Sequence, residues 1–403
     1  MAIKIRVGFL FNHYFPHQVP HAAPYAFELS RLYPDHFDVL IACATGEEFS
    51  FAQKIASFYP GSKVKFLRLP APWYYQIFDP LISTWAFGRK TMVLKRNLDF
   101  FKTLDALVAP ERHCSRLRTK FGLWDLIMIH TRHGAGDRRG GFDPKIKYFN
   151  FVLLPGQKYV DRLKELGLLE EGKYALVGWP KFEVVEKLHP RRPKIFDNEN
   201  LTVVYNPHFD QRVASWNKWG LKVFEFFAKH PEYNLIFAPH VVLFKRRLRH
   251  RARKIPSKYY HLPNIHIDLG SMASVDMTYM LAADIYLGDV SSQVYEFIWK
   301  PRPCIYLNAH RVKWQGNPYY FHWTFGQVVE DFEQDFEKAL AQALELQPFF
   351  EPRQKEAFRY TFYQEPGSTA AQRGAKAIAN FLLSHPRLED KIRRLQSLKS
   401  SPK

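Results

Sequence analysis

A loop rich in glycine and arginine follows one of the most apolar stretches of the sequence. Residues 126–144 read LIMIHTRHGAGDRRGGFDP, with His130 and His133 where the apolar residues end. Histidine has an ordinary pKa of about 6.5, which suits proton transfer at neutral pH. Gly134 and the glycines after it would let the backbone approach a substrate closely, and the arginine pair that begins at Arg138 could neutralise a phosphate. The loop has the composition of a catalytic loop, and a solvated surface loop would share that composition.

Two further strand ends carry side chains that suit a phosphorylated ligand. VVYNPHFD (203–210) places Asn206 and His208 after a predicted strand, and IFAPHVV (236–242) places His240 after the next one. Amide and imidazole N–H groups donate hydrogen bonds to phosphate oxygens. These residues are therefore candidates for contact with the phosphates of a donor substrate, and His240 is also a candidate for catalysis. Asn-Pro is equally a turn signal, and a histidine at such a position is often part of a core or a cap.

The segment IYLGDVSSQVYEF (285–297) has the polar residues Asp289, Ser291 and Ser292 between a predicted strand and a predicted helix. Hydroxyls and backbone N–H groups at a helix start bind anions, and the helix dipole adds to the attraction. Glu296 follows one turn later, where its carboxylate could hold the hydroxyls of a ribose. Because an ordinary helix N-cap uses the same residue types, the segment is informative only together with the other strand ends.

Each of these candidates follows a short apolar run that is typical of a buried strand. Before residue 189 such runs alternate with helix-like segments at 24–33 and 158–167, and strands are predicted at 3–11, 37–44, 63–70, 104–110, 125–130, 149–156 and 173–180. The alternation predicts an α/β fold with a doubly wound parallel sheet. Ligands of such sheets bind beyond the carboxyl ends of the strands, which is where the candidates lie.

A break in composition at 189–200 (HPRRPKIFDNEN) predicts a domain boundary, because proline, charge and asparagine are dense there. The alternation then restarts, with helices predicted at 215–230, 274–283 and 292–300 and strands at 201–207, 233–240, 264–270, 284–292 and 303–309. We expect two Rossmann-like domains facing across a cleft. Their predicted ranges are 1–190 for the acceptor side, 200–370 for the nucleotide donor, and 371–403 for a C-terminal helix that packs back on the first domain.

Composition and charge limit the classes of protein that this sequence can represent. The chain has 403 residues, 46% of them hydrophobic, which suits two sizeable cores and excludes a disordered protein. The formal net charge of +19 favours a polyanionic partner: nucleic acid, an anionic membrane surface or a phosphorylated substrate. No apolar run reaches the roughly 18 residues of a transmembrane helix, and the first residues lack the features of a signal peptide. Three widely spaced cysteines, Cys43, Cys114 and Cys304, suit a reducing cytoplasm.

The run KRRLRHRARK (245–254) contains seven lysines or arginines in ten residues. Apolar residues recur around it at steps of three and four, which predicts a helix with one apolar stripe and one cationic face. Contact with anionic lipid or phosphate is the functional interpretation, and a docked surface helix with a solvated face is the alternative. The candidate membrane contacts are Lys245, Arg246, Arg249 and Arg253.

Histidines also follow the first predicted strand, in NHYFPHQVPHAAPY. His13 and His21 are candidate contacts for an acceptor, together with Arg138 of the glycine-rich loop. A proline-rich surface loop explains the histidines nearly as well.

Taken in order over residues 120–380, these segments resemble the CDP-glycerol glycerophosphotransferase family, the teichoic-acid polymerases and primases with a GT-B-like fold. The family's strand followed by His-Gly is similar to IHTRHGAGD, its Gly-x-Pro turn to VGWP, and its Thr-Asp-Tyr-Ser-Ser and Arg-Pro block to GDVSSQVYEFIWKPRP. The matching positions are His133, Gly134, Gly178, Pro180, Pro207, His240, Asp289, Ser291, Ser292, Arg302, Pro303 and Arg373. The sequence departs from the family pattern at Ala238, Val241, Gly288 and Val290, and Glu296 replaces an aspartate.

The resemblance implies a transferase that moves a glycerophosphate-type (polyol phosphate) group from a CDP-activated donor to a hydroxyl of a membrane-associated glycan or lipid. His133 would be the general base, while His240, Ser291 and Ser292 would hold the phosphates and Glu296 the ribose. The protein would be cytoplasmic and peripheral on the inner face of the cell membrane. Cationic side chains can neutralise the phosphates, so no cofactor is expected, although Mg²⁺ is compatible with the chemistry.

Three other functions fit parts of the sequence. A nucleotide-sugar-dependent GT-B glycosyltransferase in cell-surface polysaccharide or glycolipid synthesis would use the same fold and the same nucleotide site. The net charge would also suit a nucleic-acid-binding protein, but aromatic and basic recognition motifs are missing, so no nucleic acid is expected as a partner. A non-catalytic membrane scaffold would leave His133 and His240 without a role.

Overall fold

The computed structural model describes residues 4–13, 15–73, 75, 88–138, 141–244 and 252–400, the last three of them as backbone only. Within these ranges the chain divides into two compact units. Unit 1 comprises Met1–His133, Phe142–Lys187 and Thr361–Lys403, and unit 2 comprises Gly134–Gly141 and Leu188–Tyr360. Residues 134–141, predicted in the first domain, thus group with unit 2, and residues 361–370, predicted in the second, group with unit 1.

Unit 1 is built on a seven-stranded parallel sheet of order β3-β2-β1-β4-β5-β6-β7. In this sheet Phe9 lies beside Ile41 of β2 and Val108 of β4. The strands are β1 (Ile5–Phe11), β2 (Phe37–Cys43), β3 (Lys65–Arg68), β4 (Ala106–Ala109), β5 (Ile127–Thr131), β6 (Phe151–Leu154) and β7 (Tyr174–Leu176). Each lies inside one of the predicted strand ranges or extends one residue beyond it.

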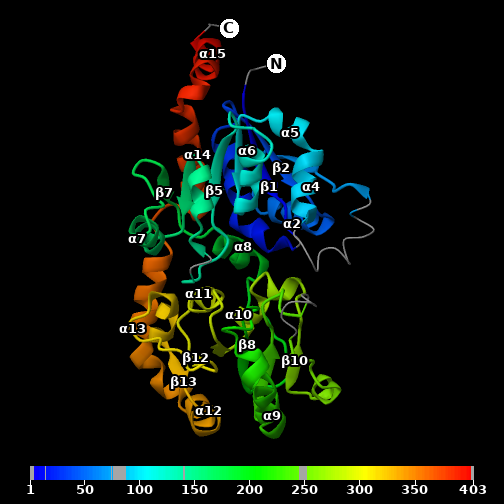
Figure 1. The fold of residues 1–403 in the computed structure, drawn as a ribbon, viewed down its shortest axis with the longest axis vertical. Coiled ribbons are helices and arrows are strands. Elements are labelled where there is room, and N and C mark those ends of the chain that lie inside the picture. Colours follow the sequence, from blue (N-terminus) through cyan, green and yellow to red (C-terminus); the bar gives the residue numbers. More distant parts are fainter. Residues whose placement is uncertain are drawn as a thin grey trace. The chain divides into compact units, whose positions relative to one another are not determined.

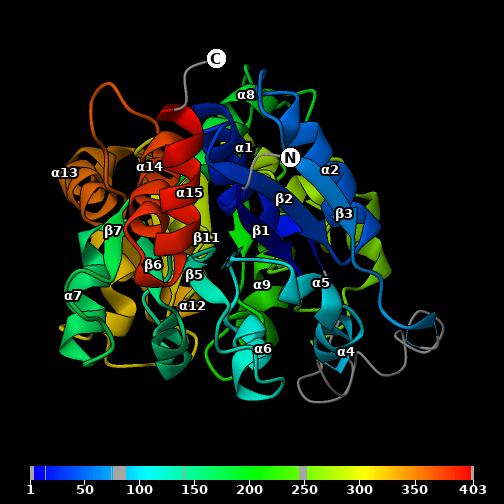
Figure 2. The same ribbon diagram turned by 90° about the horizontal axis from the view of Figure 1, so that it is seen from above.

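Helices cover both faces of this sheet, as Figure 2 shows. One face packs Leu10, Leu107 and Met128 against Val93 of α4 and Phe101 of α5. On the other face lie α1 and α2, and α14 packs along α1. The helices of unit 1 are α1 (Ala23–Leu32), α2 (Gly46–Ala56), α4 (Gly88–Arg96), α5 (Leu98–Lys102), α6 (Arg116–Thr119), α7 (Gln157–Glu165), α8 (Lys181–Leu188), α14 (Ala370–Leu383) and α15 (Glu389–Ser400).

Unit 2 is built on a six-stranded parallel sheet of order β10-β9-β8-β11-β12-β13. The strands are β8 (Leu201–Asn206), β9 (Tyr233–Phe237), β10 (Ile265–Ile267), β11 (Ile285–Gly288), β12 (Cys304–Leu307) and β13 (Gln327–Val329). On one face Tyr205 and Leu287 pack with Phe224 of α9 and Phe336 of α12. Figure 1 shows α9 and α12 beside the strands of this sheet. The helices are α9 (Leu221–Lys229), α10 (Thr278–Ala282), α11 (Val294–Phe297), α12 (Phe332–Ala341) and α13 (Ala343–Thr361). The predicted α/β class with two Rossmann-like domains is confirmed.

Three predicted helices differ from the structure. The helix expected at 274–283 is only α10, because Met277 before it has a left-handed backbone with φ = 69°. The helix expected at 292–300 is a single turn, α11: the N–H of Ile298 still bonds Val294, but that of Trp299 bonds Glu296, and Arg302 then leads into β12. The cationic helix expected around 245–254 lies mostly outside the described residues. Its neighbours on either side, 241–244 and 252–256, form turns and irregular structure, so the predicted helix does not extend through them.

The turn after β7 holds the C-terminal segment of unit 1. Gly178 has φ = 85°, and the Arg373 side chain donates hydrogen bonds to the carbonyls of Val177 at 3.1 Å and Tyr363 at 3.3 Å. A methyl group added at Gly178 would lie 2.5 Å from the Tyr363 carbonyl oxygen and 2.7 Å from Arg373 Nη2. The Gly-x-Pro turn and Arg373 of α14, two matches to the family pattern, therefore contact each other.

Gly178→Ala is expected to lower the free energy of unfolding by about 2–5 kcal/mol. About 1 kcal/mol or more comes from placing an alanine in the left-handed region, and the rest from the overlap with Tyr363 and Arg373. Gly167→Ala is the matched control, because Gly167 has φ = 61° but no atom within 4 Å of an added methyl group. Denaturant unfolding measures both variants, and equal losses would show that the contact with Arg373 contributes nothing.

Candidate functional site

The switch point of the unit 2 sheet lies between β8 and β11, where open parallel sheets bind their ligands. β8 ends at Asn206 and β11 at Gly288. The Asp289 carboxylate joins the loops that follow: Oδ1 accepts from the backbone N–H of His208 at 3.0 Å, and Oδ2 accepts from the N–H and the hydroxyl of Ser215 at 2.7 and 2.9 Å. The polar residues after the two strands are thus held in one rigid group.

The side chains of Asn206 and Asp289 connect this group through hydrogen bonds. Both side chains are fully buried, and Asn206 donates to the Ala238 carbonyl at 2.6 Å. Burial raises the pKa of the Asp289 carboxyl, while hydrogen bonds from Ser215, Val290 and His208 oppose that rise. Their polar atoms serve bonds inside unit 2, so the structure gives both residues a positioning role. Direct contact with a donor stays a prediction for each.

His208 and His240 lie side by side in this group, with ring centroids 5.6 Å apart. The backbone N–H of Asp210 donates to His208 Nδ1 at 3.1 Å, and that of Val242 donates to His240 Nδ1 at 3.3 Å. A neutral imidazole that accepts at Nδ1 carries its proton on Nε2. Burial, together with the nearby His240 and Arg138, holds the pKa of His208 well below its ordinary value. Both rings can therefore donate an Nε2–H hydrogen bond to an anionic oxygen.

Arg138 is part of unit 2 and lies beside Asp210. Its Nη2 lies 3.5 Å from Asp210 Oδ2, and Arg212 pairs with the same carboxylate at 2.8 Å. The hydrogen bond from Arg212 holds the pKa of Asp210 below its ordinary range. Arg138 was predicted to contact the acceptor together with the N-terminal histidines, but it groups with unit 2 and lies close enough to His208 to lower that residue's pKa. Contact between Arg138 and an acceptor stays a prediction.

The two serines after β11 differ in exposure. Ser291 is buried, its hydroxyl accepting from the backbone N–H of Gln293 at 3.4 Å, whereas Ser292 is half-buried. Gly136 lies against Ser292, and a methyl group there would sit 3.0 Å from Ser292 Cβ. Because α11 has only four residues, the helix dipole expected to strengthen anion binding is small. Glu296, in that turn, is 6% exposed.

Gly288, one of the departures from the family pattern, has a steric cause. A methyl group at Gly288 would lie 2.5 Å from the hydroxyl of Tyr286, whose ring is fully buried on the same face of β11. The Tyr286 hydroxyl reaches Asn206 Oδ1 at 3.5 Å. The tyrosine thus fills the space that a larger residue at 288 would need.

A buried cluster around Asp137 was not predicted from the sequence. The Asp137 carboxylate accepts from the Tyr295 hydroxyl at 2.7 Å and from His322 Nδ1 at 2.8 Å, and His322 Nε2 donates to the Asp289 carbonyl at 2.9 Å. Both ring nitrogens of His322 face oxygen atoms, and with Asp137 ionised the ring donates from both of them. Asp137 and His322 form a buried ion pair that fixes the glycine-rich loop. The one indication of this cluster in the sequence is the acidic Asp137 beside the arginines of the glycine-rich loop.

In unit 1 the switch point lies between β1 and β4, and β5 is the next strand along. His133, two residues after β5, has its Nδ1 2.5 Å from the Pro110 carbonyl oxygen, so Nδ1 carries the proton and Nε2 the lone pair. Burial lowers the pKa of His133 to about 4, partly offset by the bond to Pro110. The ring is neutral at neutral pH and has the tautomer that a general base needs. At Gly134 an added methyl group would meet no atom within 4 Å, so close approach to a substrate there stays a prediction.

The predicted acceptor residues His13 and His21 lie near His133 in unit 1. His13 follows β1, and its N–H donates to Glu48 Oε1 at 2.7 Å. His21 ends the 3₁₀ helix η1 (Pro16–His21) and packs its ring on Trp179, with centroids 4.5 Å apart. Between them, His17 lies with its ring centroid 5.6 Å from that of His133. The structure thus brings the N-terminal histidines and His133 together.

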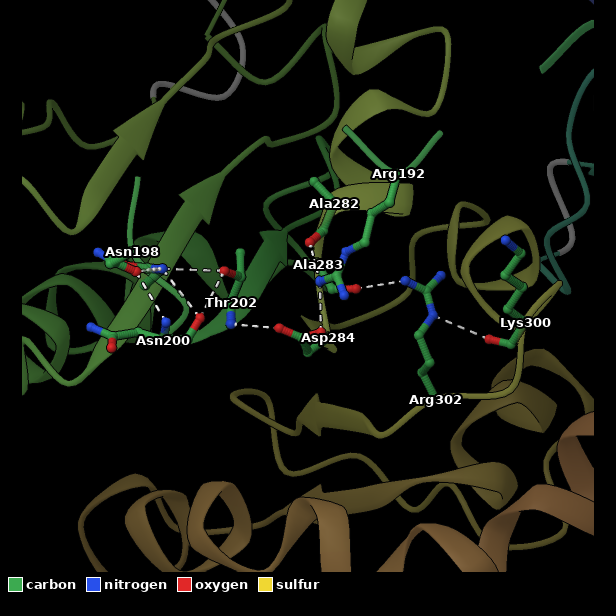
Figure 3. A network of polar contacts seen from close by, with 10 residues as sticks. Arg192, Asn198, Asn200, Thr202, Ala282, Ala283, Asp284, Lys300 and Arg302 are labelled. Atoms are coloured by element: carbon green, nitrogen blue, oxygen red, sulfur yellow. Dashed lines mark hydrogen bonds and ion pairs between the residues drawn. The ribbon is translucent and has the colours of Figure 1, made fainter. Parts of the chain in front are cut away.

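The Arg302 of the family's Arg-Pro block lies at the opposite, amino end of the unit 2 strands (Figure 3). Its guanidinium donates to the carbonyls of Ala283 at 2.5 Å and Phe297 at 2.8 Å and lies over the Phe297 ring. Burial lowers the pKa of Arg302 to about 10. Beside it, Asp284 accepts from Arg192 and from the N–H of Thr202 (Figure 3). Arg302 therefore supports the sheet and is remote in the fold from Asp289 and Ser291.

The remaining predictions concern membrane contact and metal binding. Lys245, Arg246 and Arg249 lie outside the described residues, while Arg253 is exposed, with its backbone bonded to Asn217 and Trp216. Of the helices in the described ranges, none is long and apolar enough to cross a membrane. Nor do three or more His, Cys, Asp or Glu side chains gather as a metal site anywhere in those ranges.

Two doubly wound parallel sheets, each with polar side chains at the strand ends beside its switch point, define a two-domain α/β protein of the GT-B type. A scan against protein-family models finds no match to this chain, and no curated protein matches it in sequence.

Solved structures with this fold are similar. A variant of the wall teichoic acid polymerase TagF gives a TM-score of 0.59 at 10% identity, covering 98% of this chain and 90% of that one. A variant of TagF soaked with CDPG gives 0.57 at 12% identity, with the same coverage. The UDP-GlcNAc 2-epimerase from Neisseria meningitidis, bound to UDP-GlcNAc, gives 0.55 at 14% identity, covering 95% and 100%. These neighbours are enzymes, and at such identities the likeness establishes the fold.

Proposed function

We propose that this protein is a transferase that moves a polyol-phosphate group, such as glycerophosphate, from a CDP-activated donor to a hydroxyl of a membrane-associated glycan or lipid. The main observation behind this proposal is the group of residues at the switch point of unit 2. There His208 and His240 each have an Nε2–H donor, and Arg138 lies near His208. The likeness in fold to TagF, of which a variant was soaked with CDPG, supports this class of donor.

In the proposed complex the diphosphate lies beside His208 and His240. The two imidazoles supply hydrogen bonds and Arg138 supplies positive charge, which together offset the charge of the phosphates. The half-buried hydroxyl of Ser292 adds a further donor, and Glu296 is proposed to bind the ribose. Phosphoryl transfer depends mainly on such positioning and electrostatics, and these residues require no metal for that task.

The chemical step follows from the state of His133. The acceptor hydroxyl oxygen attacks the phosphorus that bears the polyol, and His133 Nε2 takes the hydroxyl proton. A new P–O bond to the acceptor forms, the P–O bond to CMP breaks, and CMP leaves with the bridging oxygen. The bond from Nδ1–H to Pro110 keeps the lone pair on Nε2 and stabilises the imidazolium as it forms.

The proposed location follows from charge. A net charge of +19 favours an anionic membrane surface, where a lipid-linked or glycan acceptor would lie. We propose a cytoplasmic protein that is peripheral on the inner face of the membrane.

A nucleotide-sugar glycosyltransferase is the second candidate, because UDP-GlcNAc 2-epimerases share the fold and one is bound to UDP-GlcNAc. In that reaction the attack falls on the anomeric carbon and a nucleoside diphosphate leaves. At Ala238 and Val241 the sequence differs from the family's motif on the donor side. These differences are compatible with a nucleotide sugar as the donor.

Incubation with radiolabelled CDP-glycerol, and separately with UDP- and CMP-sugars, tests the two candidates. A membrane lipid extract serves as the source of acceptor. We expect CMP and labelled lipid or glycan from CDP-glycerol alone. Release of a nucleoside diphosphate from a UDP-sugar, with no CMP from CDP-glycerol, would establish the second candidate instead.

Nucleotide binding provides a check that does not need the acceptor. CMP at about 100 times its Kd should stabilise the protein by about 2.7 kcal/mol in a thermal-shift assay. The stabilisation should fall in His240→Ala and persist in His261→Ala, whose imidazole is exposed. Equal shifts in both variants would remove His240 from the donor site.

A further inference from the structure

We propose that unit 1 holds a site for an uncharged hydroxyl-bearing group, a polyol or a sugar, beneath the ring of His133. The site consists of Gln18, His21, Glu111 and Trp179, and we call it the hydroxyl site. It rests on the proposed function, because its occupant would be the end of the acceptor that carries the attacking hydroxyl.

The hydroxyl site contains buried polar atoms that lack a hydrogen-bond partner within the described part of the chain. These atoms are Gln18 Oε1, His21 Nδ1, Glu111 Oε1 and Trp179 Nε1. The four residues are 1, 2, 6 and 4% exposed, respectively. Leaving such an atom unpaired costs about 1–3 kcal/mol, so four in one region point to a ligand that pairs with them.

Hydrogen bonds and ring contacts connect these residues to the surroundings of His133. Gln18 Nε2 lies 3.4 Å from His133 Nε2, and His133 Nδ1 binds the carbonyl of Pro110, the residue before Glu111. His21 packs on Trp179 and is close enough to His133 to have its pKa lowered by it, after burial itself and Lys181. The four residues lie in segments that follow the carboxyl ends of β1, β4 and β7, and His133 follows β5.

The chemistry of the site selects neutral hydroxyls. Glu111 Oε2 is paired with Lys90 at 2.5 Å, so the pair has no net charge, and Oε1 remains as an anionic acceptor. A phosphate placed there would meet a carboxylate oxygen and be repelled, whereas a hydroxyl can donate to Oε1 or to Gln18 Oε1 and accept from the indole N–H of Trp179. Adjacent donors and acceptors of this kind match the paired hydroxyls of a polyol or sugar.

The same geometry explains how the acceptor would be aligned. The Gln18 amide nitrogen donates to the lone pair of His133 Nε2 at 3.4 Å. A hydroxyl bound to Gln18 Oε1 would therefore lie near Nε2 and would replace this long hydrogen bond when it gives up its proton. Gln18 is thus a specificity-determining residue for the acceptor.

Saturation-transfer NMR with glycerol and with methyl α-glucopyranoside as separate probes tests the site. We expect at least one probe to bind the wild-type chain, and Gln18→Leu to weaken that binding about five- to tenfold, the loss of one hydrogen bond. Gln53→Leu, on the exposed face of α2, is the matched control and should bind as the wild type does. Glycerol 3-phosphate should not displace the bound probe.

Three results would overturn the inference: neither probe binds, Gln18→Leu binds as well as wild type, or glycerol 3-phosphate displaces the probe more strongly than glycerol does. If Gln18→Leu fails to fold, Trp179→Phe replaces it, because it removes only the indole N–H and keeps the ring against His21. CMP binding is measured on the same samples. Probe binding without CMP binding would overturn the proposed function alone, and CMP binding without probe binding would overturn the hydroxyl site alone.

Discussion

His133→Asn is expected to lower the rate of transfer from CDP-glycerol by about 10²–10⁴-fold, the usual contribution of a general base. Asparagine retains an N–H that can donate to the Pro110 carbonyl in place of Nδ1–H, but it has no basic atom at the position of Nε2. The loss should therefore appear in kcat, with the shift in melting temperature on CMP binding unchanged. Steady-state kinetics and thermal shift on the same preparation measure the two effects.

His261→Ala is the control for this prediction, since its imidazole is exposed and it belongs to unit 2, whereas β5 belongs to unit 1. It should retain wild-type kcat. If His133→Asn retained more than about a tenth of the wild-type rate, His133 could not be the base, and the proposed mechanism would have to be abandoned.

The pH profile gives an independent test of His133. Burial lowers its pKa to about 4, so the base is neutral and active above that value. The kcat/KM of the free enzyme should rise with pH through about 4 and then level off. The limb in kcat should lie at higher pH, because a bound diphosphate favours the imidazolium. A kcat/KM limb centred at 6.5 or above would contradict the buried, neutral state.

The same shift affects stability. An unfolded histidine has a pKa of about 6.5, and the folded value is lower, so the unfolded chain binds the proton first. The contribution of His133 to stability is complete above about pH 6.5 and is lost progressively as the pH falls through about 4. Buried His21 and His208, whose pKa values are also lowered, act in the same direction.

Asp137→Ala is expected to lower the free energy of unfolding of unit 2 by about 3–5 kcal/mol. The change leaves a buried, charged His322 and the Tyr295 hydroxyl without their acceptor, and an unpaired buried charge is costly. Denaturant unfolding followed by tryptophan fluorescence measures the loss, because Trp323 lies beside His322 and bonds to the Asp289 carbonyl.

Glu333→Ala is the matched control, because its ion pair with Lys222 is largely exposed and should contribute less than about 1 kcal/mol. Asp137→Ala combined with His322→Phe should cost less than the sum of the two single changes by more than about 1 kcal/mol, since no stranded charge remains. Additive losses would show that Asp137 and His322 do not form a coupled ion pair.

Much of the fold follows from local sequence patterns. The apolar runs around Val7, Ile129, Val204 and Leu287 are short and lie between helical segments, and both features depend only on neighbouring residues. They identified every strand except β13 (Gln327–Val329) and placed His133, His208, His240 and Asp289 just beyond strand ends. The length of α11 was overestimated, because the spacing of apolar residues in 292–300 does not record where backbone hydrogen bonds change partner.

The role of each polar residue depended on contacts that the sequence does not show. Asp289 has the residue type of a ligand contact, yet its four hydrogen bonds from His208, Ser215 and Val290 make it a support for the loops. Arg302 matches a family motif, yet it binds carbonyls at the other end of the sheet. Identical residue types serve binding or support according to the partners that the fold gives them.

The sequence by itself determined the α/β class, the positions of all strands except β13 and the residues at their carboxyl ends, because strand and helix periodicity are short-range properties. Only the tertiary structure decided the tautomer of His133, the Nε2–H donors of His208 and His240, and the pairing of Asp137 with His322. Asp137 and His322 are 185 positions apart in the chain. Proton positions and burial are set by atoms brought together from such distances, so no local pattern contains them.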